Sequence, residues 1–530
     1  MRVRGTVSRS NANSISIMDT TLRDGEQTPD VAYAPAEKLQ LARLLLKSVC
    51  VDRIEIAQTR VSEGERKAAQ RIVAWARKER LLPRIEIMGY VDGGASIDWI
   101  TGVGGKVMNL LLKGSERHCR MQLGVDPEKH RAQVAQTVQQ AKRKRLRVNP
   151  YLEDWSNGVR DSFDYVFSMV QLLEGLGVDR IYLPDTLGIL SPEDVTRYVG
   201  LMTATWPDVS FEFHGHNDYG LATANALAAV RAGARGLHTS VNGMGERTGN
   251  TRLPEVVAAI HDHTSLRTGV VETKLTALSR MVETFTGKDV SSNTPIVGRD
   301  VYTHTGGIHA DGDVKGNLYG STLAPARFGE RRRYALGKLS GKASLDHNLK
   351  QLGIDLGPED RKLVLQRIKD LGDKKNSVSA EDLPYIIADV LKSPDEQRVR
   401  VESYHVTVGT GEPPTAELTL RSGRRSVRAN AKGDGGYDAF MNALRKAARK
   451  LDVEVPRLQD YRVRIPPGGR SAALVETLIT WKGSAKAPGS FSTLGVDSDQ
   501  LAAAVIATEK MLNAIALRQR GASARRNTRH

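Results

Sequence analysis

Short apolar runs alternate with amphipathic stretches along the first half of the chain. The runs have the alternation and β-branched content of strands and cover 14–19, 53–57, 84–89, 106–112, 147–153, 179–184, 209–214 and 235–241. The stretches between them have helical periodicity, as in Ala36 to Lys47, whose leucines form one broad apolar face. Eight strand–helix repeats within about 270 residues are typical of a (β/α)8 barrel. An open doubly wound sheet is the competing fold, but no glycine-rich dinucleotide motif follows any of these runs.

The pattern changes after residue 290. Short, charged helices are predicted there, among them Pro358 to Leu371 and Ala380 to Leu391, and we interpret this part as a connector. Two similar units follow, each with several strands and then a helix, at Tyr437 to Leu451 and Ser498 to Leu517, which indicates an internal duplication. The predicted organisation is a barrel over 15–290, a flap and helical connector over 291–395, a duplicated α+β domain over 396–517 and a basic disordered tail over 518–530.

The 530-residue chain has a net charge of +16, which raises the possibility of nucleic-acid binding. Half of this excess lies at the two ends, with three arginines in residues 1–14 and five in residues 518–530 and no acid in either segment. Polar ends of this kind are typical of disordered segments. Aromatic residues make up only 5%, and no basic stretch interleaves with them as a stacking surface requires. Nucleic-acid binding is therefore expected of the tail at most.

Two further features of the composition concern the compartment. The chain has only two cysteines, Cys50 and Cys119, which cannot form a disulfide framework. It has no run of about 18 apolar residues, and the first ten residues lack the apolar core of a secretory signal. We therefore expect a cytoplasmic protein.

Two histidines end the seventh predicted strand. Residues i and i+2 of a strand share one face, so His214 and His216 project side by side while the phenylalanines of that strand point the other way. Such a pair could bind one metal ion or could be a merely polar strand end. An acidic residue after the first strand, Asp24, could add an oxygen ligand, with Arg23 beside it.

Polar residues follow nearly every predicted strand at its carboxyl end. They are Arg23, Asp24, Gln58, Lys113, Glu153, Asp154, Asp185, Thr186, His214, His216 and Asn242. Active sites of (β/α)8 barrels lie at this end of the strands. The arrangement therefore predicts an active site in which Asp24, His214 and His216 hold a metal ion and leave positions open for substrate.

Three motifs resemble the signatures of one known family. They are Asp19-Thr-Thr-Leu-Arg-Asp-Gly-Glu-Gln27, His214-Gly-His-Asn-Asp218 and Asn242-Gly-Met-Gly-Glu-Arg-Thr-Gly-Asn250. The family is that of the metal-dependent Claisen-condensing acyltransferases and lyases, which includes isopropylmalate, homocitrate and citramalate synthases, and the similarity covers about residues 15–517. Four more motifs resemble the (R)-citramalate synthase branch, namely Tyr151-Leu-Glu-Asp-Trp-Ser-Asn-Gly158, His309-Ala-Asp-Gly312, Asp434-Gly-Gly-Tyr-Asp-Ala-Phe440 and Arg464-Ile-Pro-Pro-Gly-Gly469.

The resemblance implies condensation of acetyl-CoA with a 2-keto acid, with a divalent ion (Mn, Mg, Zn or Co) as cofactor. It adds Asn250 to the metal site, although a loop-capping amide is an equal alternative. Arg23 would stabilise the alkoxide that forms as the keto group is attacked, or would be a structural partner of Asp24. Thr186 would bind the substrate carboxylate, or would cap a βα turn.

Three more residues complete the catalytic set that the resemblance implies. Glu153 would remove the methyl proton of acetyl-CoA or anchor the group that does so. His309 and Tyr319 come from the partner subunit in related enzymes and cover the active site during the steps that end in thioester hydrolysis. From composition alone, His309 and Tyr319 would be interpreted as ordinary polar loop residues.

The resemblance also places Met88, Leu111 and Tyr151 around the side chain of the keto acid. Citramalate synthases have leucine, leucine and tyrosine there, so Met88 departs from the pattern but nearly conserves volume. A bulky apolar wall without a cation favours pyruvate, and thus (R)-citramalate and the first step of a threonine-independent isoleucine pathway. Because one methylene is worth only about 1–3 kcal/mol, 2-ketoisovalerate and the 2-isopropylmalate synthase reaction stay open.

For the duplicated domain the resemblance implies a dimeric module that binds an end-product amino acid, expected to be isoleucine. The residues carried over to its effector pocket are Tyr437, Asp438, Leu458 and Tyr461. An α+β domain without ligand is the alternative. Two other classes remain, a lyase that runs the reverse cleavage on the same scaffold and a catalytically inactive sensor.

Overall fold

The computed structural model of the protein describes most of the chain. The described residues are 13–352, 354–373, 378, 382–390, 399–464, 475–482 and 491–527. The chain divides into two compact units, one built from residues up to Tyr302 together with Ser321–Arg331, and one from Thr303–Gly320 together with residues from Arg332 onward.

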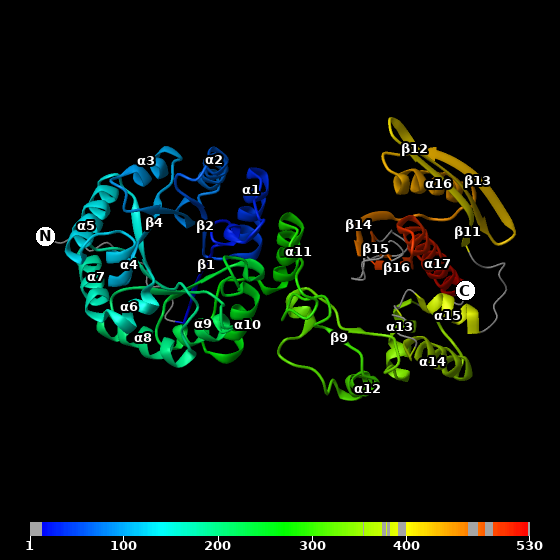
Figure 1. The fold of residues 1–530 in the computed structure, drawn as a ribbon. Coiled ribbons are helices and arrows are strands. Elements are labelled where there is room, and N and C mark those ends of the chain that lie inside the picture. Colours follow the sequence, from blue (N-terminus) through cyan, green and yellow to red (C-terminus); the bar gives the residue numbers. More distant parts are fainter. Residues whose placement is uncertain are drawn as a thin grey trace. The chain divides into compact units, whose positions relative to one another are not determined.

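The first unit contains a closed barrel of eight parallel strands, with helices around it (Figure 1). The strands are β1 Ser16–Asp19, β2 Arg53–Gln58, β3 Ile85–Tyr90, β4 Val107–Lys113, β5 Arg147–Glu153, β6 Ile181–Asp185, β7 Phe211–Gly215 and β8 Gly236–Thr239. Each begins and ends within two residues of its predicted position. β1 pairs with β8, which closes the barrel, so the predicted (β/α)8 fold is confirmed.

Helices surround this barrel. They are α1 Pro35–Arg43, α2 Glu63–Lys78, α3 Ala95–Gly102, α4 Glu116–Met121, α5 Pro127–Arg143, α6 Trp155–Asp161, α7 Phe163–Gly175, α8 Pro192–Thr205, α9 Ala222–Arg231, α10 Leu253–His263 and α11 Leu275–Thr286. Caps fix where several begin, because the side chains of Ser62, Asp126 and Ser191 accept a backbone N–H from the first turn of α2, α5 and α8. The predicted helix at 36–47 is α1 and a π-helical turn, Leu44–Val49, that continues it.

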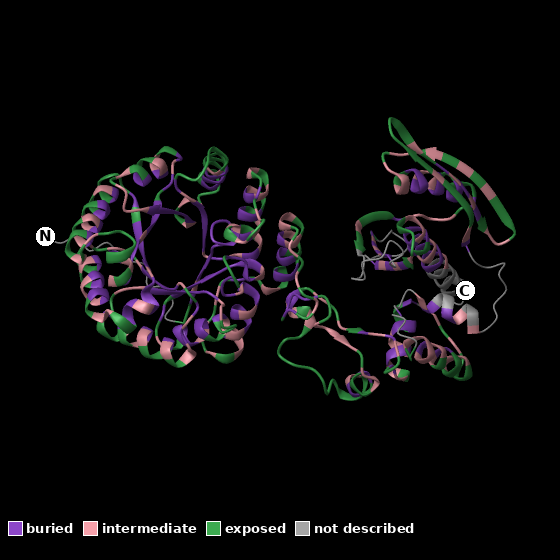
Figure 2. Ribbon diagram, in the orientation of Figure 1, coloured by how far each residue is buried: buried purple, intermediate pink, exposed green. Residues whose placement is uncertain are grey.

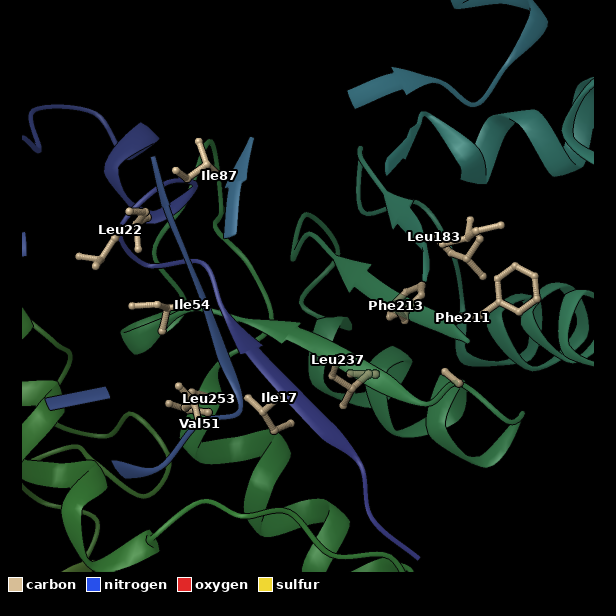
Figure 3. Close-up of a cluster of buried hydrophobic side chains, with 14 of the residues drawn as sticks. Ile17, Leu22, Val51, Ile54, Ile87, Leu183, Phe211, Phe213, Leu237 and Leu253 are labelled. Atoms are coloured by element: carbon tan, nitrogen blue, oxygen red, sulfur yellow. The ribbon is translucent and has the colours of Figure 1, made fainter. Parts of the chain in front are cut away.

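Strand residues alternate between the helices and the barrel interior. Ile17 of β1, Phe213 of β7 and Leu237 of β8 lie in the apolar layer that the helices cover, together with Leu253 of α10 (Figure 3). Most residues of the barrel strands are buried, with exposure confined largely to the strand ends, whereas the surrounding helices bury one face (Figure 2). Glu212 faces the interior, where it meets Arg53, so the predicted alternation in the seventh strand is confirmed. The barrel interior contains many polar side chains, and the candidate site is built from them.

The second unit begins with the predicted flap and connector. The flap holds β9 Thr303–His304, α12 Gly307–Gly316 and β10 Arg333–Tyr334, with β9 and β10 paired. The connector helices are α13 Lys342–Leu352, α14 Pro358–Asp373 and α15 Leu383–Val390, around a hydrophobic cluster of their own. The predicted helices at 358–371 and 380–391 correspond to α14 and α15, and residues 380, 381 and 391 lie outside the described residues.

Two copies of one motif form the rest of this unit. The first is β11 Val399–Gly409, β12 Glu412–Ser422, β13 Arg425–Lys432 and α16 Gly436–Lys450, and the second is β14 Arg457–Arg464, β15 Val475–Lys482, β16 Phe491–Asp497 and α17 Gln500–Asn527. Each copy is a three-stranded antiparallel sheet followed by a helix, and the two share one hydrophobic cluster. The predicted duplication is confirmed.

The end of the chain differs from the prediction. α17 continues to Asn527, so residues 518–527 are helical and not a disordered tail. The segment lacks proline and consists largely of arginine, glutamine and alanine, which favour helix once one has begun. Our prediction weighed its charge and ignored this propensity. Residues 1–12, predicted to be disordered, and 528–530 lie outside the described residues.

Cys50 and Cys119 are both free thiols, as expected. Cys119 is buried, whereas Cys50 is partly exposed and ends the π-helical turn in a left-handed conformation, with φ 64°. Within the described residues, no helix combines the length and the apolar character needed to cross a membrane.

Candidate metal centre and active site

The turn after β1 carries Arg23 and Asp24. The backbone N–H groups of Arg23 and Gly25 both donate to Thr20 O, at 3.0 and 3.1 Å, which closes the turn. Lys38 of α1, only 1% exposed, supports the turn from behind, because its Nζ donates to Leu22 O at 3.0 Å and to Glu65 of α2 at 2.6 Å. The two charged side chains are therefore held at the carboxyl end of the barrel.

Asp24 meets the two histidines of β7. His214 Nε2 lies 3.3 Å from His216 Nε2 and 3.3 Å from Asp24 Oδ2. All three residues are buried, and one ligand atom from each lies within 4.8 Å of the others. No described residue offers a hydrogen-bond partner to Oδ1 of Asp24 or Nδ1 of either histidine. Two imidazoles and a carboxylate that converge in this way fit a divalent ion.

Asn250 lies next to this cluster. It forms an isolated bridge with His216, and its Nδ2 donates to Met244 O at 2.9 Å. Its Oδ1 is buried and has no hydrogen-bond partner among the described residues. Gly245, at φ 149°, allows this approach, because a Cβ there would lie 2.2 Å from Asn250 Nδ2 and 3.3 Å from Asp24 Oδ1. The amide thus anchors the loop through its nitrogen and keeps an oxygen free for an ion.

The charges of the cluster suit metal binding. Burial would raise the pKa of Asp24, but Arg23 and His214 hold it well below its usual range. Burial and the neighbouring His214 lower the pKa of His216 to about 4. At neutral pH the site therefore offers an ionised carboxylate and a neutral imidazole, the forms that ligate cations.

Arg23 joins two carboxylates beside the cluster. Its Nε donates to Glu55 Oε2 at 2.6 Å, its Nη1 lies 3.2 Å from Asp24 Oδ2, and its Cζ lies 5.8 Å from the ring centroid of Tyr151. Glu55 is held in turn by Asn109, at 2.7 Å. Burial alone would lower the pKa of Arg23, but Glu55 and Asp24 raise it. Both predicted roles of Arg23 thus have a geometric basis, since it is paired and lies at the site.

The three predicted wall residues lie together inside the barrel. Met88 and Tyr151 share a small buried cluster with Met18 and Tyr182, and Leu111 packs against it. The ring centroid of Tyr151 lies 5.8 Å from that of His214. An apolar surface therefore adjoins the candidate ligands.

Glu153 and Thr186 occupy the ends of β5 and β6. Glu153 forms an ion pair with Lys113 at the end of β4, a contact that the sequence reasoning missed. Lys113 is fixed at both backbone groups, because its N–H donates to His130 and its carbonyl accepts from Tyr165. Thr186 Oγ1 accepts from the backbone N–H of Asp154 at 2.9 Å, which joins the turn after β6 to the turn after β5. The hydroxyl proton of Thr186 is left to donate elsewhere.

His309 and Tyr319 lie in the second unit. Their ring centroids are 4.3 Å apart, with His309 in α12 and Tyr319 just after Asn317, the residue that caps the end of this helix. Tyr319 is held by its backbone N–H, which donates to Asp313 Oδ1 at 3.2 Å. The flap thus brings these two residues together.

The four predicted effector residues are arranged less uniformly. Tyr437 and Tyr461, one from each copy of the motif, have ring centroids 5.1 Å apart, and Tyr437 Oη lies 2.7 Å from Thr508 Oγ1. Asp438 instead accepts from the backbone N–H of Asp434 at the start of α16. Leu458 is exposed. The two tyrosines thus form a direct contact between the two copies.

Several polar residues inside the barrel were missed by the sequence reasoning. They are Arg53, Glu55, Glu86, Asn109, Asn149 and His238. Charged residues flanked by isoleucine in Arg53-Ile-Glu-Ile and Ile85-Glu-Ile could have indicated the first three, since both faces of a barrel strand are buried.

Three segments of the sequence match known families. Residues 14–282 match the family described as HMGL-like, residues 296–376 the homocitrate synthase post-HMGL domain-like family, and residues 377–516 the LeuA allosteric (dimerisation) domain. The first match contains all eight barrel strands, and the third contains all six strands of the duplicated motif. The predicted resemblance is confirmed.

The relatives that match most of the chain are named for two different activities. The putative (R)-citramalate synthase of Methanopyrus kandleri is 36% identical over 461 residues, which cover 87% of this chain and 89% of that protein. The probable 2-isopropylmalate synthase of the same organism is 33% identical over 511 residues, 96% and 99%. The (R)-citramalate synthase of Methanocaldococcus jannaschii is 33% identical over 469 residues, 88% and 92%. Because these identities are so close, similarity alone does not separate the two substrates.

Proposed function

Because the chain belongs to the HMGL-like family, we propose that it condenses acetyl-CoA with pyruvate and hydrolyses the thioester, giving (R)-citramalate and CoA. The observation that carries this proposal is the buried cluster of Asp24, His214 and His216 beside Arg23 and an apolar wall. The names of its relatives support the wider class of the enzyme, an acyltransferase that makes a new carbon–carbon bond. The enzyme is proposed to be a cytoplasmic homodimer, with residues 377–516 as its dimerisation domain.

The keto acid would bind at the mouth of the barrel. A divalent ion held by Asp24, His214, His216 and Asn250 would supply a Lewis acid for the carboxylate and keto oxygens of the substrate. The guanidinium of Arg23, fixed by Glu55, would stabilise the negative charge that develops on the keto oxygen. Thr186 has a hydroxyl proton to donate to the substrate carboxylate.

The acetyl group must lose a methyl proton before it can attack. Glu153 would take this proton or anchor the base that does, and Lys113 would hold the Glu153 carboxylate in place. The resulting carbon nucleophile bonds to the keto carbon, and the keto oxygen gains the displaced electron pair and a proton. Water then adds to the thioester carbonyl and free CoA leaves. His309 and Tyr319 of the flap are proposed to assist there, from the partner subunit.

Pyruvate is preferred here because the bulky apolar wall of Met88, Leu111 and Tyr151 suits a methyl group and would leave little room for a branched side chain. The second candidate is the 2-isopropylmalate synthase reaction, favoured by the relatives that carry that name. The test is release of free CoA from acetyl-CoA with pyruvate, 2-ketoisovalerate or 2-ketoglutarate. A clear preference for 2-ketoisovalerate would replace the first candidate by the second. Cleavage of citramalate without condensation would indicate a lyase, and no turnover at all a sensor.

Enlarging the pocket should change this preference. In Leu111→Ala we expect activity on 2-ketoisovalerate relative to pyruvate to rise about tenfold or more, since each added methylene is worth about 1–3 kcal/mol in an apolar pocket. Leu110→Ala is the matched control, because Leu110 points into the outer apolar layer. That variant should lose about 2–5 kcal/mol of unfolding free energy and keep the substrate preference. Equal ratios of kcat/KM in the two variants would contradict the assigned pocket.

Feedback control is proposed to act through the two-tyrosine contact. None of the catalytic candidates lies in the duplicated motif, so an effector must act by favouring one arrangement of the chain over another. We expect isoleucine to inhibit turnover, and Tyr437→Ala or Tyr461→Ala to raise the inhibitory concentration about tenfold or more while uninhibited turnover stays the same. Titration calorimetry with isoleucine, leucine and valine identifies the effector. No heat with any of the three would end this proposal and leave the barrel chemistry standing.

A further inference from the structure

A chain of polar contacts runs inside the barrel from the pocket wall to its opposite end. Tyr151 Oη lies 2.9 Å from His238 Nδ1, and His238 Nε2 lies 3.2 Å from Glu212 Oε2. Glu212 is held between Arg53 at 2.5 Å and Arg180 at 3.0 Å. His238 has no role in the proposed reaction and is fully buried. His238 contacts the wall residue Tyr151 directly, on the side away from the pocket. It is therefore a candidate for control of the pocket.

The direction of the hydrogen bonds follows from their acceptors. A carboxylate between two guanidinium groups can only accept, so the proton of a neutral His238 ring lies on Nε2. Nδ1 then has no proton and accepts from the hydroxyl of Tyr151. The phenol thus donates away from the pocket, and Tyr151 presents its ring, and not an acidic proton, to the substrate.

Aromatic contacts hold the same ring from the side. The ring centroids of Tyr151 and Tyr182 are 4.7 Å apart, and those of Tyr182 and His238 are 4.3 Å apart. Tyr182 is itself fixed, because its hydroxyl donates to Glu86 at 2.8 Å and accepts from Arg53 at 2.9 Å. Among the described residues, His238 is the one hydrogen-bond partner of the Tyr151 hydroxyl. Movement of Tyr151 therefore requires a buried hydroxyl to lose its partner, which is unfavourable.

We propose that His238 is a positioning residue that sets the depth of the keto-acid pocket by fixing Tyr151. The proposal rests on the proposed function, since it assigns specificity to the same site. With the hydrogen bond in place, the ring cannot withdraw to admit a branched side chain. Without it, the ring is held only by its contacts with Tyr182, Arg23 and its other neighbours, and the pocket accepts larger 2-keto acids and holds pyruvate less well.

The test is a double-mutant cycle between the two residues. Tyr151→Phe and His238→Phe each remove the hydrogen bond and keep an aromatic ring. Each should raise the ratio of kcat/KM for 2-ketoisovalerate over pyruvate by about fivefold to tenfold, mainly through KM for pyruvate, with kcat within about twofold. Because both changes break one contact, the double variant should show no more than the larger single effect.

Two further variants distinguish a positioning role of His238 from a general loss of structure in the barrel interior. His238→Asn keeps an acceptor near the place of Nδ1 and should retain a ratio closer to wild type than His238→Phe. Ser16→Ala removes a contact of 3.2 Å to Arg53, far along the same polar chain, and should leave the ratio unchanged. Thermal unfolding shows whether each variant is folded, and Tyr151→Phe and His238→Asn keep the test open if His238→Phe does not fold.

The two proposals can fail separately. If the wild-type enzyme condenses neither keto acid, the proposed function is wrong. If it does, but the two single effects add in the double variant or the ratio stays at the wild-type value in both, His238 does not act through Tyr151 and the inference is overturned.

Discussion

Replacement of His214 by alanine should abolish turnover while the protein stays folded. His214 Nε2 lies 3.3 Å from both Asp24 Oδ2 and His216 Nε2, at the centre of the ligand set. Without it, one carboxylate, one imidazole and the amide oxygen of Asn250 remain, and an amide oxygen is a weaker ligand for such an ion than the lost imidazole. Loss of Lewis-acid stabilisation worth several kcal/mol corresponds to a fall in kcat of about 1000-fold or more. Asp24→Ala and His216→Ala should behave alike.

Chelation provides the complementary measurement. Wild-type enzyme stripped with a chelator should lose activity and regain it when a divalent ion is restored, whereas His214→Ala should not respond to the ion. His261→Ala is the matched control, because this histidine is paired with Glu272 on the outer side of the barrel and should not affect the metal. Full activity in chelator-stripped wild-type enzyme would refute the metal site.

The positions of the site residues could be predicted because strand ends are local features of the sequence. His214 and His216 share a strand face, and the carboxyl ends of barrel strands meet at one mouth. The predicted encounter with Asp24, far away in sequence, therefore needed only the fold. The wall residues Met88 and Leu111 lie together for the same reason, since each points inward from its own strand.

The partners of these residues could not be predicted in the same way. Glu55 meets Arg23 through the stagger of two neighbouring strands, and His238 of β8 meets Tyr151 of β5 across the barrel interior, and a single sequence specifies neither. Thr186 had two interpretations from its sequence position, and the sequence did not reveal its contact with the backbone N–H of Asp154, 32 residues away. The helical end of α17 was missed because net charge was given more weight than helix propensity.

Arg23 has the second largest expected effect. Its guanidinium is buried between Glu55 and Asp24, which fix its position at the site. An arginine also keeps its charge there. A fixed cation of this kind stabilises charge that develops in the transition state without reorganisation. Arg23→Gln should therefore lower kcat by about 100- to 1000-fold, with a smaller change in KM for pyruvate.

The competing role, a structural partner only, predicts a different pattern. If Arg23 serves merely to neutralise its neighbours, Glu55→Gln should cost as much activity as Arg23→Gln, because either change breaks the same 2.6 Å pair. If Arg23 acts on the substrate, Glu55→Gln should cost much less, since the cation stays in place beside Asp24. Arg23→Lys keeps the charge but cannot donate to both carboxylates as a planar fork, so an intermediate loss is expected. Steady-state kinetics with pyruvate, together with thermal unfolding of each variant, distinguish the two roles, and a kcat of Arg23→Gln within about threefold of wild type would exclude the catalytic one.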